Sequence, residues 1–237
     1  MAVQVKDKKI LVSLIVSANL NWREDISKLK DLGINELALF VESFTLDQRK
    51  ELYRLLESSG IVSIPYVQIS NNFEEGELDY FITNHGTQVF GLALNNSTFS
   101  FISTLTKFAS LVAPENPTED KYVNLFTDES LSHSNVSGVC LDIMTLEYDR
   151  LFYKKKYQSA IHALDHHPLL ATQIGPVPES WLKKSLRLKS RRLTTLTDLH
   201  YLKNIPKTYL ADLLVLDLKN SLEEQLEIKA YLELMLK

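Results

Sequence analysis

Glycine is scarce in this chain, with seven glycines in 237 residues against a usual content of roughly 7%. The chain therefore has few glycines from which to form the glycine-rich loops that bind phosphate groups. The sequence also contains none of the motifs G-x-x-x-x-G-K-[ST], G-x-G-x-x-G, H-E-x-x-H and G-x-S-x-G. The sequence therefore lacks the motifs typical of P-loop nucleotide binding, dinucleotide binding, zincin metalloproteases and esterases.

Cysteine and long apolar runs are scarce as well. The single cysteine, Cys140, excludes an intramolecular disulfide framework and a cysteine-rich metal cluster, and it suits a reducing compartment. No apolar run reaches about 18 residues, and the opening MAVQVKDKK contains no signal-peptide core. We expect a cytoplasmic protein that does not enter a membrane.

Charge of one sign is also limited, because the net charge is −4 and the isoelectric point is near 5.9. Such a balance gives no global attraction to nucleic acid or to an anionic membrane. An extended basic face with interleaved aromatic residues is missing too, so nucleic acid is not expected as a partner. A small molecule is the expected ligand.

Apolar, β-branched runs alternate with amphipathic stretches along the whole chain. Eight runs are expected to be strands, at residues 9–17, 35–42, 61–69, 87–94, 108–114, 137–143, 168–174 and 212–218. Alternation of this kind favours a parallel sheet with helices outside it. The sequence therefore predicts one α/β domain over residues 1–237, a (β/α)8 TIM barrel. An open doubly wound sheet, the alternative, usually has fewer strands and glycine-rich turns that are absent here.

Acids and amides stand at the ends of six of these runs. They are Glu42, Gln68, Glu115, Asp142, Gln173 and Asp217. In a parallel barrel the carboxyl ends of the strands converge on one face, where TIM-barrel enzymes keep their active sites. The sequence therefore places a functional site at this face. A structural alternative stays open, because Asp or Asn at a strand end also caps the helix that follows.

Several short segments, in their order along the chain, resemble the xylose-isomerase-like TIM barrels. These segments are ELALF, IPYVQ, PENP, SGVCLDIMTLE, TDLHYLKNI and VLDLKNSLEEQLEIKAYL. That superfamily includes sugar and sugar phosphate isomerases and epimerases as well as apurinic endonucleases. The resemblance implies a site for divalent metal, held by His, Glu and Asp side chains where the strands end.

The acidic positions of the family pattern are largely kept, whereas several metal-binding histidines are replaced. Glu115 and Asp142 match the acids on the fifth and sixth strands, and Asp217 stands where the last strand of the family carries a glutamate. The replaced histidines correspond to Gln68, Thr145 and Gln173, while the later D-x-H pattern is intact as Asp198 and His200. A three-zinc nuclease cluster is therefore excluded. Asp198 also fits a second role, as a helix cap.

The remaining pattern predicts one divalent cation, Mg or Mn, since carboxylate and amide oxygens are hard ligands. Its ligands would be Glu115, Asp142, Gln173 and Asp217, and a site without a metal is the alternative. By the resemblance, Glu115 and Asp217 would move a proton at the carbon beside a carbonyl group. The predicted function is thus a metal-dependent isomerase or epimerase of a sugar or sugar phosphate. A catalytically inactive barrel that binds a small ligand or a protein partner is the alternative.

A basic run, WLKKSLRLKSRRL, follows the seventh predicted strand. TIM barrels often bind phosphate with the loops after strands 7 and 8, so Lys184, Arg187 and Arg191 are candidates for binding an anionic group. The alternative is a solvated surface segment. The sequence leaves the substrate and the oligomeric state open.

Overall fold

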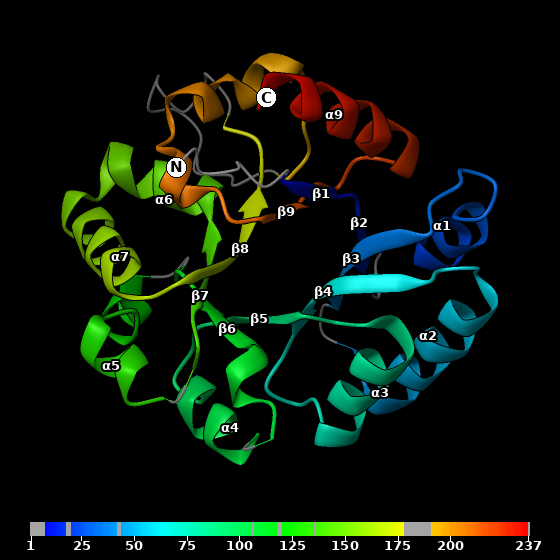
Figure 1. The fold of residues 1–237 in the computed structure, drawn as a ribbon, viewed down its shortest axis with the longest axis horizontal. Coiled ribbons are helices and arrows are strands. Elements are labelled where there is room, and N and C mark those ends of the chain that lie inside the picture. Colours follow the sequence, from blue (N-terminus) through cyan, green and yellow to red (C-terminus); the bar gives the residue numbers. More distant parts are fainter. Residues whose placement is uncertain are drawn as a thin grey trace, which may run out of the picture.

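One parallel sheet forms the centre of the molecule. The computed structural model describes residues 8–17, 20–41, 44–105, 107–117, 120–134, 136–177 and 191–236. The strands are β1 (Lys9–Leu11), β2 (Ser13–Val16), β3 (Glu36–Val41), β4 (Ser63–Ile69), β5 (Val89–Ala93), β6 (Val112–Glu115), β7 (Val139–Asp142), β8 (Leu169–Ile174) and β9 (Leu213–Leu216). They pair in the order β1-β9-β8-β7-β6-β5-β4-β3-β2, and every pairing is parallel. Viewed end-on, the strands form a nearly closed ring (Figure 1).

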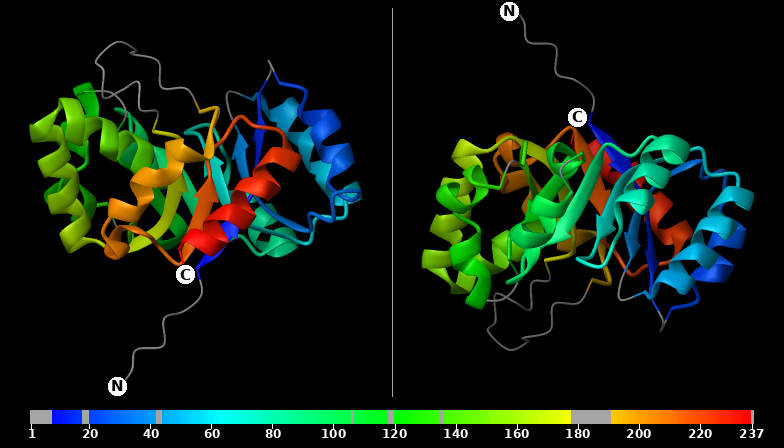
Figure 2. Two further views of the ribbon diagram at one scale, coloured as in Figure 1. Left: turned by 90° about the horizontal axis from the view of Figure 1, so that it is seen from above. Right: turned by 90° about the horizontal axis from the view of Figure 1, so that it is seen from below.

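Helices surround this ring on its outer side (Figures 1 and 2). The α-helices are α1 (Trp22–Lys28), α2 (Leu46–Ser58), α3 (Glu75–His85), α4 (Thr98–Thr104), α5 (Asp128–Ser132), α6 (Ile143–Phe152), α7 (Lys154–His166) and α9 (Leu222–Met235). Short 3-10 segments are η1 (Ala109–Leu111), η2 (Asp120–Leu125), η3 (Leu196–Asn204) and η4 (Lys207–Tyr209). The predicted single-domain TIM barrel is confirmed. No helix among the described residues has the length and apolar character needed to cross a bilayer.

Two apolar clusters fill the molecule, as expected for a barrel inside a layer of helices. The larger cluster lies between the strands and the helices and includes Trp22, Leu52, Phe81 and Ile228. The smaller cluster contains strand residues such as Phe40, Tyr66 and Cys140, which alternate with those of the larger cluster and so face the barrel interior. Cys140 is therefore a core residue.

The first expected strand, residues 9–17, is divided at Val12 into β1 and β2. β1 pairs with β9, while β2 pairs with β3, so this one segment joins the two edges of the sheet and closes the barrel. At the division, the amide group of Gln225 on α9 takes the place of a neighbouring strand. Its Oε1 accepts a hydrogen bond from the Ser13 backbone N–H at 2.7 Å, and its Nε2 donates to the Ser13 carbonyl at 3.0 Å.

Several helix ends are fixed by capping residues. Thr45 and Ser221 each cap their helices in a full capping box, with Gln48 and Glu224 as the reciprocal partners. Gly86 ends α3 in the left-handed conformation, with φ of 63°. These caps set where each helix begins or ends and therefore how the loops reach the carboxyl ends of the strands.

Replacing Gln225 with leucine should weaken the barrel closure. The substitution leaves the N–H and C=O of Ser13 without their partner in a buried position, where each unsatisfied group costs roughly 1–3 kcal/mol. We expect the free energy of unfolding, measured by urea denaturation, to fall by about 3 kcal/mol. The control is Gln88→Leu, the same change at an exposed position, which should alter stability by less than about 0.5 kcal/mol. Equal losses in the two variants would contradict this role of Gln225.

Candidate active site at the barrel mouth

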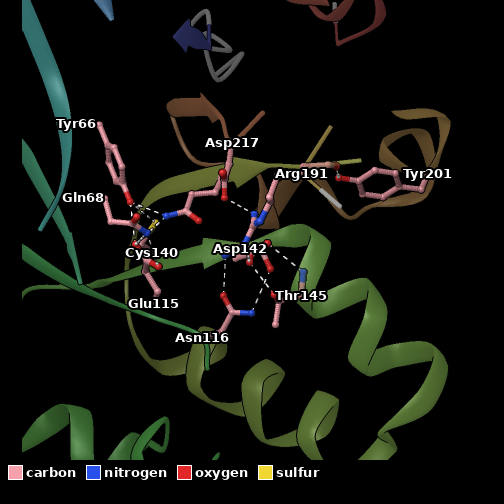
Figure 3. Close-up of polar contacts among 12 residues, drawn as sticks. Tyr66, Gln68, Glu115, Asn116, Cys140, Asp142, Thr145, Arg191, Tyr201 and Asp217 are labelled. Atoms are coloured by element: carbon pink, nitrogen blue, oxygen red, sulfur yellow. Dashed lines mark hydrogen bonds and ion pairs between the residues drawn. The ribbon is translucent and has the colours of Figure 1, made fainter. Parts of the chain in front are cut away.

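Polar side chains gather where the parallel strands end, a region that we call the barrel mouth (Figure 3). Glu115 and Asp142 are the last residues of β6 and β7, and Asp217 directly follows β9. Gln68 lies near the end of β4, and Gln173 lies near the end of β8, beside Asp142 in the strand register. All of these but Gln68 are buried. The structure thus brings together the predicted strand-end residues that it describes. Glu42 lies outside the described residues.

Glu115 is held by three side chains from neighbouring strands. Its Oε1 accepts hydrogen bonds from the Tyr66 hydroxyl at 3.0 Å, from Gln68 Nε2 at 2.9 Å and from Gln173 Nε2 at 2.8 Å. Gln173 also donates to the Tyr66 hydroxyl at 2.6 Å. Burial raises the pKa of the Glu115 carboxyl to about 7, against the lowering effect of the hydrogen bonds from Gln68 and Tyr66. Glu115 is therefore able to exchange a proton near neutral pH.

Asp142 serves both as a helix cap and as an ion-pair partner. Its Oδ1 accepts from the backbone N–H of Thr145 at 3.0 Å, and its Oδ2 accepts from the Thr145 hydroxyl at 2.6 Å. The capping alternative is therefore correct for Asp142, which begins α6. Asn116 clamps the same position, because its side-chain amide bonds both the N–H and the C=O of Asp142. Thr145, a predicted site residue, acts on the mouth through Asp142.

Arg191 joins two of the carboxylates. Its Nη2 donates to Asp142 Oδ2 at 2.8 Å, and its Nη1 forms an ion pair with Asp217 Oδ2. Burial lowers the pKa of the Arg191 guanidinium, but the charges of Asp142 and Asp217 outweigh burial and raise it above its usual value. Arg191 is therefore a permanent cation. The sequence proposed it as a phosphate ligand, and the structure shows it paired with acids of the mouth.

The four residues proposed as metal ligands fall into two groups. Glu115 and Gln173 bond to each other and to Tyr66, whereas Asp142 and Asp217 both bind Arg191. Across the described part of the chain, no three His, Cys, Asp or Glu side chains lie close enough together to hold a metal ion. The arrangement therefore does not fit the coordination of one divalent cation by this set.

The remaining predicted residues lie away from these two groups or outside the described ranges. The Asp198 carboxylate accepts a hydrogen bond from the Thr194 hydroxyl at 2.9 Å, within the segment that begins η3. The exposed His200 ring stacks near Tyr231 of α9, with ring centroids 6.5 Å apart. Lys184 and Arg187 lie outside the described residues.

Sequence reasoning missed three residues that shape the mouth. Tyr66 precedes Gln68 by two residues and so shares its inward face, a signal that strand alternation offers. Asn116 follows the strand-end Glu115. Its role depends on the backbone of Asp142 on the neighbouring strand, and the sequence alone does not show that contact. Gly91 leaves the space that the polar group needs, because a Cβ there would overlap the Tyr66 hydroxyl and lie 2.7 Å from Glu115 Oε1.

No protein-family model and no curated protein matches the sequence. Among solved structures, the chain is similar to an HpcH/HpaI aldolase from Desulfitobacterium hafniense DCB-2. The TM-score is 0.50 and the identity 11%, over 95% of this chain and 92% of the aldolase. It is also similar to a 4-hydroxy-2-oxoglutarate aldolase/2-deydro-3-deoxyphosphogluconate aldolase, with a TM-score of 0.43 and 12% identity over 96% and 94% of the two chains. The first likeness shows a shared TIM-barrel fold.

These comparisons correct the family assignment. The resemblance to xylose-isomerase-like barrels is wrong, because the solved structure whose fold this chain shares is an HpcH/HpaI aldolase, which belongs to a different TIM-barrel superfamily. The sugar isomerase or epimerase function falls with that assignment, and the alternative of an inactive barrel gains no support from the comparisons. The physical reason is that short apolar strands ending in acids arise in many parallel barrels, where the same residues cap helices.

Gly91→Ala should disturb the hydrogen bonds around Glu115. The added methyl group needs the space of the Tyr66 hydroxyl, and overpacking of this kind typically costs 1–3 kcal/mol. We expect a loss of about 2 kcal/mol in the free energy of unfolding. Gly76→Ala is the matched control, since its Cβ would meet nothing within 4 Å in α3 and helices favour alanine. A Gly91→Ala variant as stable as Gly76→Ala would contradict the close packing.

The pKa of Glu115 predicts a pH-dependent stability. Because the folded-state pKa of about 7 lies above the usual 4.5, the native state binds the proton more tightly. This contribution is complete below about pH 4.5 and is lost as the pH rises through 7, a change on the order of 3 kcal/mol. Glu115→Gln lacks it. Between pH 5 and pH 8, the free energy of unfolding of wild type should therefore fall by about that much relative to that of the variant, as measured by chemical denaturation. A difference that stays constant with pH would disprove the raised pKa.

Proposed function

We propose that the chain is a small-molecule lyase of the aldolase type, with its active site at the barrel mouth. The observation that carries this proposal is the placement of a buried carboxyl group, Glu115, in the same mouth as a guanidinium, Arg191, that is bound to two aspartates. The aldolase fold of the most similar structure described above supports it. Because one fold supports many chemistries, the proposed function depends on the residues of the mouth.

Aldol cleavage needs a proton acceptor and a cation. A base removes the proton from a hydroxyl group. The bond between the carbon that bears this hydroxyl and the carbon next to the carbonyl then breaks, and an aldehyde or ketone leaves. The electron pair of the broken bond passes to the remaining fragment, whose carbonyl becomes an enolate. Protonation of the enolate carbon then completes the second carbonyl product. The same groups, acting in reverse, form the bond.

Glu115 is suited to the proton transfers. General acids and bases work best when their pKa lies near the working pH, and burial places that of Glu115 at about 7. Both forms of the carboxyl group are then populated under neutral conditions. The hydrogen bonds from Gln68, Tyr66 and Gln173 fix the direction of its oxygen atoms.

Arg191 is suited to the developing negative charge. Its guanidinium carries five N–H donors, of which the ion pairs with Asp142 and Asp217 use only part. It is also the most accessible charged side chain of the mouth network, with 19% of its surface exposed against 9% or less for the two aspartates. A fixed cation aimed at an enolate oxygen stabilises the transition state without reorganising water. The substrate class is a small carbonyl compound with a hydroxyl group on the second carbon from the carbonyl.

Proton exchange tests this function without knowledge of the full substrate. An aldolase that forms an enolate also exchanges the hydrogens beside the carbonyl with solvent. Small ketones and 2-oxo acids, incubated with the protein in deuterated water, should incorporate deuterium at that carbon, as followed by NMR. Glu115→Gln should slow the exchange by roughly a hundredfold or more, since general acid–base groups typically contribute that much.

The control for this experiment is Glu129→Gln, which makes the same change at an exposed position on α5. It should leave the exchange rate as in wild type. The proposal fails if no compound of the panel exchanges faster with the protein than without it. It also fails if Glu115→Gln exchanges at the wild-type rate.

A further inference from the structure

We propose that the guanidinium of Arg191 is the resident cation of the barrel mouth and takes the place that a divalent metal would occupy between Asp142 and Asp217. The proposal goes beyond the lyase function, because it concerns what neutralises the two aspartates whether or not the site is catalytic. It also resolves the misfit between the predicted metal ligands and their observed contacts.

The geometry places one cation between two strand ends. β7 ends in Asp142, and Asp217 follows β9, with β8 between the two strands. The side chains of Asp142 and Asp217 are only 3% and 9% exposed, yet each directs its Oδ2 at the guanidinium. A metal bound between these aspartates would compete with the guanidinium for the same two carboxylates. Two cations at this position would repel each other, so the guanidinium and the metal are mutually exclusive.

The predicted ligands also make other contacts within the protein. Asp142 uses both carboxylate oxygens toward Thr145, which holds this side chain as a helix cap. Gln173 donates from its amide Nε2 to Glu115 Oε1 and to the Tyr66 hydroxyl, 2.8 Å and 2.6 Å away. Figure 3 shows the two groups, with Glu115 and Tyr66 on one side of the mouth and Arg191 with its aspartates on the other. A cation that gathered all four ligands would have to break contacts in both groups.

A guanidinium fits this position for chemical reasons. Its planar fork matches carboxylate oxygens, and it stays protonated throughout the physiological pH range. Lysine would present a single point charge that cannot reach two carboxylates with the same geometry. The chain is thus expected to keep its positive centre without a supply of metal ions and in the presence of chelators.

Manganese binding distinguishes the alternatives. We would titrate wild type, Arg191→Ala and Arg192→Ala with Mn2+, using calorimetry and the unfolding temperature as readouts. Arg192 is the next residue and is exposed. Its substitution removes the same charge from the chain. Wild type and Arg192→Ala should show no saturable site at the mouth. Arg191→Ala should gain one saturable Mn2+ site, about tenfold or more tighter than any unsaturable binding by wild type, because the two buried aspartates then lack the guanidinium of Arg191. Adding Asp217→Asn should abolish this gain.

Removal of Arg191 also leaves buried charges, so the variant is expected to be less stable in the absence of metal. If it does not fold alone, Mn2+ should restore cooperative unfolding, whereas Mn2+ should not stabilise Arg191→Ala with Asp217→Asn. The proposal is overturned if wild type binds one Mn2+ and loses it in Asp217→Asn. It is equally overturned if Arg191→Ala, folded or not, gains nothing from Mn2+. Neither readout involves turnover, so failure of the lyase function would leave this result standing.

Discussion

The ion pairs of Arg191 with Asp142 and Asp217 are the interaction on which the organisation of the barrel mouth depends. Two carboxylates that are almost fully buried repel each other and lose their hydration, so a cation must lie between them for both to be ionised. Arg191 supplies it from the segment after β8, beyond the residues that the structure leaves undescribed. The same contact fixes the end of β7 against the residue that follows β9, because Asp142 is the last residue of β7 and Asp217 comes directly after β9. One side chain therefore contributes both to the charge balance of the mouth and to the placement of these strand ends.

The fold follows from the sequence because its signals are repeated. Eight apolar runs alternate with amphipathic stretches, and each βα unit independently predicts a parallel sheet. Division of the first strand at Val12 was not predictable, because Ser13 is the one polar residue between Ile10 and Val16 and a single serine does not end a strand. That division depends on the distant Gln225, whose amide replaces a neighbouring strand at Ser13. Contacts between residues more than 200 positions apart leave no periodic trace in either segment.

Only part of the candidate site could be predicted. Strand-end acids and amides were found because alternation and strand direction place them at one face, and the structure joins Gln68, Glu115 and Gln173 there. Their chemistry was not predictable, since a carboxylate that caps a helix and one that binds a metal look alike in sequence. Asp142 is a cap and an ion-pair partner at once. Its cation, Arg191, lies in a basic run that composition alone assigns to an anionic ligand or to the surface.

The two halves of the mouth are electrostatically coupled. The charges of Asp142 and Asp217 raise the pKa of Glu115 beyond the effect of burial. Glu115 in turn raises the pKa of Arg191, and the coupling between two charges is reciprocal, so Arg191 favours the ionised form of Glu115. Arg191 therefore offsets part of the field of the aspartates at Glu115. Without it, the pKa of Glu115 would be higher. The cation that holds the aspartates together thus also favours the ionised form of the carboxyl group that is proposed to move protons.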